Sequence, residues 1–126
     1  MNSVVHFEIP MDDKARAMKF YEKTFGWQLM DMPEMNYILA TTTESGDQGP
    51  KNPGAINGGL AKRGEQITQP SFSIDVPNID EAIEKIKAEG GSVITEKMPV
   101  GDMGVIAYFK DTEGNLLSLW QDLPKA

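Results

Sequence analysis

The chain has 126 residues, of which 40% are hydrophobic and 25% charged, and its formal net charge at pH 7 is −7. This length suits one domain with a hydrophobic core, but not two independent domains. The acidic balance, without a block of like charges, argues against a nucleic-acid surface and against attraction to anionic membranes. The chain has no cysteine, which excludes disulfides, thiolate nucleophiles and zinc–cysteine sites. No apolar run has the length of a membrane span and no signal-peptide pattern follows the first methionine, so we expect a cytoplasmic protein.

The N-terminal segment predicts a strand followed by a helix. Residues 4–10 alternate between apolar and polar side chains, as in a half-buried strand, with His6 and Glu8 on the polar face. Asp12 or Asp13 is suited to cap the helix that follows, because a short acceptor side chain satisfies its unpaired N–H groups. The apolar stripe of this helix and the glycine that ends it are Ala17, Met18, Tyr21, Phe25 and Gly26.

Three more strands are predicted in the first half of the chain. Residues 27–32 and 37–42 are typical of a strand pair around a Pro-Glu turn, and residues 55–62 are predicted to form the last strand. Residues 44–54 hold three glycines and two prolines without periodicity, so we expect a loop there.

The second half predicts the same order of elements. Residues 71–76 alternate strictly, Asn78 or Asp80 is suited to cap a helix, and this helix is expected to end at Gly90. A hairpin turn is expected at 111–115, which includes a glycine where a positive φ is needed. The other predicted strands are 92–95, 105–110 and 116–121.

Residues 6–26 and 71–91 repeat one pattern at a constant offset of 65 positions. The matched positions are Phe7 with Phe72, Ile9 with Ile74, Ala17 with Ala82, Met18 with Ile83, Tyr21 with Ile86 and Gly26 with Gly91. The chain therefore predicts two copies of one βαβββ unit, which is an α+β class. The two copies differ most in chemistry where His6 falls opposite Ser71.

Strand alternation places several polar side chains on the strand faces that the helices do not cover. If the two sheets curl together, these residues line one concave surface, which we expect to be the binding site. The candidate ligand-binding residues are His6, Glu8, Ser71, Ser73, Ser118 and Trp120.

The motifs at both ends of the chain resemble those of the vicinal oxygen chelate superfamily. Residues 6–10 (His-Phe-Glu-Ile-Pro) and 20–27 (Phe-Tyr-Glu-Lys-Thr-Phe-Gly-Trp) are similar to its first module, and residues 111–119 resemble its closing Asp-Pro-x-Gly-Asn hairpin. This superfamily contains glyoxalase I, bleomycin- and fosfomycin-resistance proteins and extradiol dioxygenases. The resemblance implies one glyoxalase-like domain over 1–126, in which two modules form a curved mixed-sheet cup. Module one is expected at 1–62, the linker at 63–69 and module two at 70–126.

In the metal-dependent members, the resemblance implies four ligands at equivalent positions. Carried over to this chain, they fall on His6, near Gly58 with Asn57 as its neighbour, on Ser71 and on Ser118. Divalent first-row metals need three or four imidazole or carboxylate donors, and serine hydroxyls are poor replacements. The sequence therefore predicts no metal site and no cofactor.

The function that we expect from this reading is binding of a small, partly apolar molecule in the cup without a metal. One alternative is a metal-dependent lyase, isomerase or dioxygenase with a rebuilt site, and the sequence leaves open whether any reaction is catalysed. Another alternative is an interaction module whose cup has lost its ligand. By analogy with the family, a homodimer is expected.

Overall fold

The computed structural model describes residues 1–46 and 49–123, which form two compact units. The first unit comprises His6–Pro70, and the second comprises Met1–Val5 together with Ser71–Ala126. The N-terminal residues belong to the second unit because the Asp75 N–H donates a hydrogen bond of 2.8 Å to the Ser3 carbonyl. The expectation of a single domain, with the module bounds given above, stays a prediction.

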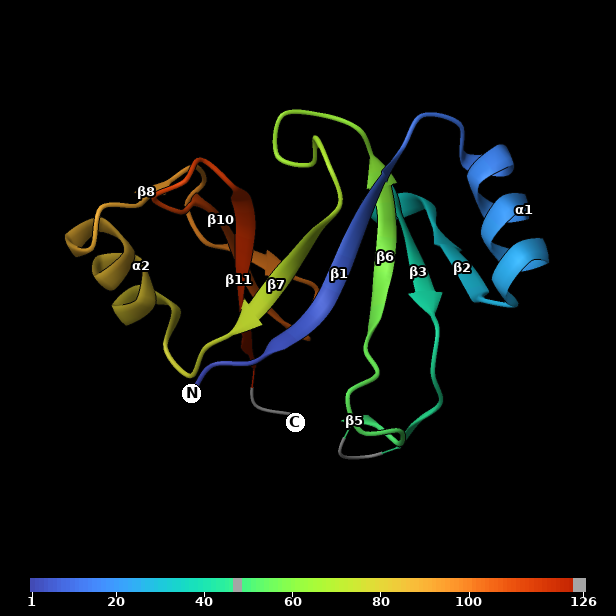
Figure 1. The fold of residues 1–126 in the computed structure, drawn as a ribbon, viewed down its shortest axis with the longest axis horizontal. Helices are drawn as coiled ribbons and strands as arrows, with labels where there is room; N and C mark the ends of the chain where they lie inside the picture. The colour runs from blue at the N-terminus through green and yellow to red at the C-terminus, as the bar shows by residue number, and fades with distance from the viewer. Residues whose placement is uncertain (47–48, 124–126) are drawn as a thin grey trace. The chain divides into compact units, whose positions relative to one another are not determined.

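The first unit is a four-stranded mixed sheet with one helix (Figure 1). The strand order is β2-β3-β6-β1, in which β6 pairs in parallel with β1 and antiparallel with β3. A separate ladder joins β4 to β5. The elements are β1 (Val4–Met11), α1 (Lys14–Phe25), β2 (Gln28–Met32), a 3-10 helix (Pro33–Met35), β3 (Tyr37–Thr41), β4 (Ser45–Gly46), β5 (Gly49–Pro50) and β6 (Asn57–Lys62).

Local chemistry fixes both ends of α1. The Asp13 side chain accepts a hydrogen bond from the Arg16 N–H, and Gly26 takes a left-handed φ of 73°, which a glycine adopts without strain. The helix covers one face of the sheet, where Met11, Ile38 and Leu60 form the buried core. The polar face of β1, which carries His6, is therefore turned away from the helix.

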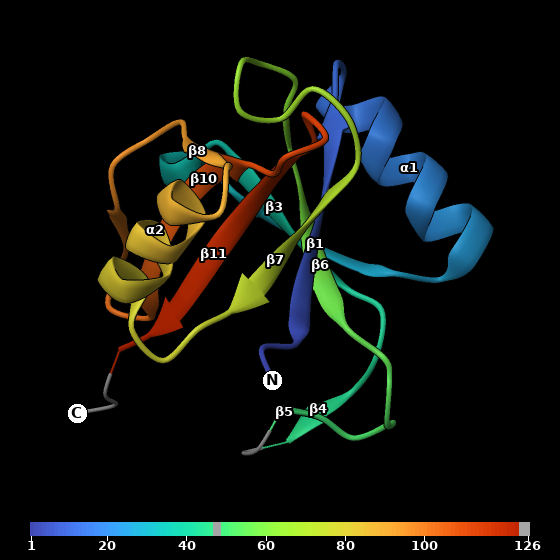
Figure 2. The ribbon, with the colours of Figure 1, turned by 60° about the vertical axis from the view of Figure 1, so that its left-hand side comes forward.

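The second unit repeats this arrangement with another mixed sheet and another helix (Figure 2). Its strand order is β7-β11-β10-β8, and β9 also pairs with β10, in antiparallel orientation. Strand β11 pairs in parallel with β7 and antiparallel with β10. The elements are β7 (Ser71–Asp75), α2 (Ile79–Ala88), β8 (Ser92–Val93), β9 (Met98–Val100), β10 (Gly104–Lys110) and β11 (Leu116–Asp122).

The internal repeat is visible in the helix caps. Asn78 caps α2 as Asp13 caps α1, at the predicted offset of 65 residues, by accepting a hydrogen bond from the Glu81 N–H. The α2 face of the sheet holds the second core, whose buried members are Val76, Ile79, Ala107, Phe109 and Leu119. The α+β class and the two βαβββ units are thus present as predicted.

Three local expectations were wrong. The segment 44–54 contains the short β4–β5 ladder, although residues 47 and 48 lie outside the described part. The edge strand β9 was missed because it contains Pro99, which lowers strand propensity and is tolerated at sheet edges. Strand β8 covers only two residues of the predicted 92–95. The second helix does end where it was expected to, because α2 stops at Ala88 and Gly90 follows its C-cap with a φ of 98°. In the described part, no helix is long and apolar enough to cross a membrane.

Candidate functional site

The centre of the first unit's polar face is a hydrogen bond between His6 and Tyr37. The His6 Nε2 atom lies 2.7 Å from the Tyr37 hydroxyl, and the two rings are stacked at a centroid distance of 6.3 Å. His6 is on β1 and Tyr37 is on β3, so the contact crosses the intervening strand β6.

Gly59 provides the space for this contact. It lies on β6 opposite Glu8 of β1 and opposite Leu39 of β3. A Cβ atom at Gly59 would overlap with the Tyr37 hydroxyl and ring. The missing side chain therefore allows the Tyr37 ring to lie across β6 and reach His6.

Apolar side chains adjoin the His6–Tyr37 pair on the same face. In the β2–β3 register, Met32 is opposite Tyr37 and Met30 is opposite Leu39, which places all four side chains on one side. The Met30 side chain is 62% exposed. Flexible thioethers next to a polar pair suit a ligand with apolar parts.

Glu8 is buried, with only 4% of its surface exposed. The Glu8 carboxylate is therefore enclosed by the protein and not solvated at the surface.

The candidate serines of the second unit are joined by internal hydrogen bonds. Ser73 and Ser118 are opposite one another in β7 and β11, are each 1% exposed, and their Oγ atoms are 2.6 Å apart. The Ser71 hydroxyl donates to the Leu116 carbonyl at 2.9 Å. These hydroxyls thus satisfy backbone or neighbouring side-chain groups within the unit.

Trp120 is on the same face of the second unit as the serines. Its indole N–H donates to Asp122 at 2.6 Å, and its ring lies over Gly104 of the neighbouring strand. Opposite Trp120 in the register is Asp75. Burial, and then the nearby Asp122 carboxylate, raise the pKa of Asp75 above its ordinary value of 3.8. That the two polar faces line one common surface stays a prediction.

The donors at the positions that the family resemblance assigns to a metal do not fit one. Asn57 accepts hydrogen bonds from the Thr42 and Thr43 N–H groups, at 2.8 and 3.0 Å, and its amide nitrogen donates to Ser45. Ser71 and Ser118 contribute only hydroxyls, both in hydrogen bonds. Within residues 1–46 and 49–123, no group of three or more His, Cys, Asp or Glu side chains is placed to hold an ion. One imidazole with amide and hydroxyl oxygens is a weak set for a first-row divalent metal.

The pH dependence of stability should report the burial of His6. Desolvation lowers the pKa of the imidazole below its ordinary value of 6.5, so the unfolded chain binds this proton more readily than the folded chain. The free energy of unfolding should therefore fall as the pH drops below 6.5. Thermal unfolding measured from about pH 7.5 to 5 should show a flatter profile for His6→Asn than for the wild type. Equal slopes for the two proteins would contradict the burial of a neutral imidazole.

Comparisons with known proteins establish the family. Residues 3–119 match the sequence profile of the Glyoxalase/Bleomycin resistance protein/Dioxygenase superfamily. Lactoylglutathione lyase of Escherichia coli O157:H7 is 30% identical over 128 positions, covering 94% of this chain and 92% of the relative. A glyoxylase-like domain-containing protein of Didymella fabae is 33% identical over 115 positions, covering 86% of this chain and 84% of the relative. The chain belongs to this superfamily, as its motifs predicted.

Solved structures support the same fold. The methylmalonyl-CoA epimerase of Mycobacterium tuberculosis has a TM-score of 0.67 at 17% identity, covering 96% of this chain and 88% of its own. A glyoxalase/bleomycin resistance protein/dioxygenase superfamily member from Vibrio splendidus 12B01 has a TM-score of 0.64 at 16% identity. The alignment covers 97% of this chain and 100% of the Vibrio chain. At these identities the similarity concerns the fold, which is the predicted glyoxalase type.

Tyr37 is the site residue that sequence reasoning missed. The sequence analysis includes it only as part of the predicted strand 37–42. Two signals were available: Tyr37 begins a predicted strand, and a glycine inside the next strand indicates a close approach by another group.

Proposed function

We propose that this protein binds a small, partly apolar molecule, without a metal ion, on the strand face that carries His6. The observation that carries the proposal is the hydrogen bond between His6 Nε2 and the Tyr37 hydroxyl. It gives the chain's one histidine a protein partner at its Nε2 atom. A lone imidazole held in this way is better suited to orient a polar group of a ligand than to hold an ion.

The neighbouring side chains indicate the character of the ligand. Met30, Met32 and Leu39 provide an apolar surface beside the polar pair. Because its pKa is lowered, His6 is neutral at pH 7 and attracts no anion by charge. We therefore expect a ligand with a hydroxyl or carbonyl group attached to an apolar body.

The proposal is tested by measuring metal content and ligand binding on the same preparations. Purified protein, incubated with Mn²⁺, Fe²⁺, Zn²⁺ or Ni²⁺ and then desalted, should contain no near-stoichiometric metal by mass spectrometry. A thermal-shift screen of small oxygenated aromatic and aliphatic compounds should give hits with the metal-free protein. Stoichiometric metal that disappears in His6→Ala would instead support a metal-dependent enzyme, in line with the name of the lactoylglutathione lyase relatives.

Tyr37→Phe should weaken the binding of such a hit by roughly fivefold to tenfold, because a hydroxyl in a ligand-facing hydrogen bond is lost. Tyr21→Phe is the matched control, since Tyr21 stacks on Trp27 on the helix side of the sheet, at 4.8 Å. Binding should be unchanged in that control. Equal affinities for wild type and Tyr37→Phe, measured by isothermal titration, would show that the ligand lies elsewhere.

A further inference from the structure

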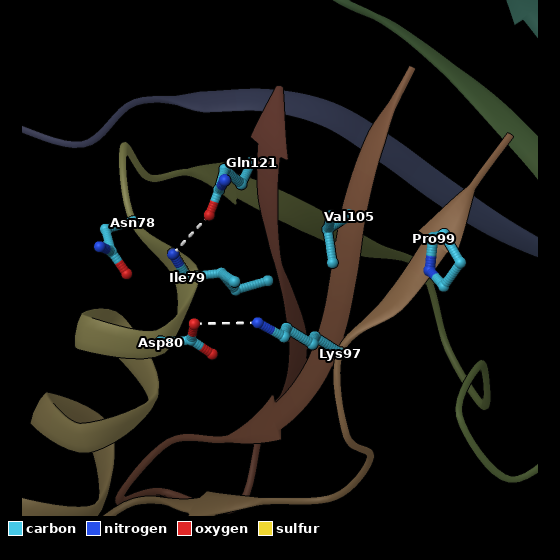
Figure 3. Close-up of a pocket in the computed structure, with 7 residues that line it drawn as sticks. All are labelled: Asn78, Ile79, Asp80, Lys97, Pro99, Val105 and Gln121. Carbon is cyan, nitrogen blue, oxygen red and sulfur yellow. Dashed lines mark hydrogen bonds and ion pairs between the residues drawn. The ribbon is translucent and has the colours of Figure 1, made fainter. Parts of the chain in front are cut away.

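A pocket of about 300 Å³ lies on the α2 side of the second unit (Figure 3). Val105 of β10 and Gln121 of β11 are opposite each other in the register, so their side chains lie on the same face of the sheet. Within β11, Ser118 and Trp120 point to the other face, because side chains alternate along a strand. The pocket is therefore on the face of the sheet opposite to these two candidate residues. It is independent of the proposed function, which rests on the first unit.

The floor of the pocket is apolar. Ile79 is 2% exposed and points toward Val105, while Pro99 of the edge strand closes one side, as Figure 3 shows. A volume of this size is at the lower end of small-molecule sites and excludes large cofactors. A compact ligand with an apolar side group matches the size and the floor.

The walls carry two opposite charges side by side. The Lys97 ammonium is 2.9 Å from one carboxylate oxygen of Asp80, and both side chains are more than half exposed. An exposed pair of this kind contributes little to stability and is available to other partners. A ligand with its own adjacent ammonium and carboxylate groups would place each next to the opposite charge.

Amide groups add donors on the other side of the floor. The Gln121 Oε1 atom accepts a hydrogen bond from the Ile79 N–H at 2.8 Å, which turns the side chain toward the start of α2. The amide nitrogens of Gln121 and Asn78 have no hydrogen-bond partner among the described residues. The amide N–H of Gln121 and the Lys97 ammonium thus favour a carboxylate in the ligand.

We propose that this pocket binds a free α-amino acid with an apolar side chain. Its carboxylate lies against Lys97 and the amide nitrogen of Gln121, its ammonium against Asp80, and its side chain on Ile79 and Val105. A ligand with only a carboxylate would be repelled by the Asp80 carboxylate. A ligand with only an amine would be repelled by the Lys97 ammonium. The zwitterion satisfies both charges, so the side-by-side ion pair is the feature that selects it.

The test is a titration of the full-length ¹⁵N-labelled protein, followed by NMR, with four probes. L-leucine is the ligand probe, isovalerate carries only the carboxylate, isopentylamine carries only the ammonium, and glycine lacks the apolar group. L-leucine should shift the backbone amides of Ile79, Asp80, Lys97, Val105 and Gln121 saturably. The other three probes should bind at least roughly tenfold more weakly.

Charge-removing variants assign the contacts. Lys97→Met and Asp80→Asn should each weaken L-leucine binding by roughly tenfold. The matched controls are Lys87→Met and Glu84→Gln. These residues form another exposed ion pair on α2, with an N–O distance of 3.7 Å, and neither lines the pocket. Both controls should leave L-leucine binding unchanged. Circular dichroism of each variant checks that the fold is retained.

Three results would overturn the proposal. The first is the absence of a saturable shift up to roughly 50 mM L-leucine, which is weaker than specific recognition requires. The second is isovalerate binding as tightly as L-leucine, because Asp80 would then have no part in recognition. The third is saturable shifts confined to residues around His6 and Tyr37, which would place the ligand in the site of the proposed function.

Discussion

Replacing Gly59 by alanine is expected to lower the free energy of unfolding by about 3 kcal/mol, the largest effect that we predict for a single methyl group. The added Cβ would overlap with the Tyr37 ring and hydroxyl, so this ring must leave its position across β6. Its displacement also breaks the 2.7 Å hydrogen bond to His6. The smaller entropic gain of replacing a strand glycine, about 0.5–1 kcal/mol, offsets only part of this loss.

Urea unfolding of Gly59→Ala and of a control variant, Gly64→Ala, measures this effect. At Gly64 the nearest atom to an added Cβ is 3.9 Å away, so we expect a change within about 0.5 kcal/mol. Tyr37→Leu in the Gly59→Ala background should recover part of the lost stability, because it removes the overlapping ring. Wild-type stability of Gly59→Ala would contradict the packing of Tyr37 over β6.

The sequence predicted those features of the fold that depend on short-range chemistry. Helix starts were predicted correctly because Asp13 and Asn78 carry acceptors that satisfy backbone N–H groups within their own turn. The left-handed Gly114 in the hairpin, with a φ of 82°, was expected for the same local reason. Strand alternation also separated the helix-covered faces from the polar faces in both units.

The site was less predictable because its contacts join residues that are far apart in the sequence. The His6–Tyr37 bond spans 31 positions and depends on a glycine in a third strand. The Ser73–Ser118 bond spans 45 positions and depends on the register of β7 with β11. Neither contact can be predicted from the alternation of apolar and polar residues, because alternation assigns a side chain to a face of the sheet but does not identify its partner on another strand. The shared cup of the two modules and the homodimer stay predictions.

Replacing Ser118 by alanine is expected to lower the free energy of unfolding by about 1–3 kcal/mol, because it leaves the buried Ser73 hydroxyl without its partner. The two residues are each 1% exposed and their Oγ atoms are 2.6 Å apart, so water has little access to the orphaned group. Ser73→Ala should have a similar cost. The double variant should cost far less than the two single variants together, since no unpaired hydroxyl is left.

A double-mutant cycle measured by urea unfolding quantifies this coupling, and Ser92→Ala is the control. Ser92 is exposed in β8, so its replacement should change stability by no more than about 0.5 kcal/mol. A coupling of about 1 kcal/mol or more between positions 73 and 118 would mean that the two hydroxyls act as one unit. A ligand or metal ion that used either oxygen would first have to break this hydrogen bond, at about the cost that the single variants show. Strict additivity of the two substitutions would instead show that each hydroxyl has another partner, and that Ser118 remains available as a donor to a ligand.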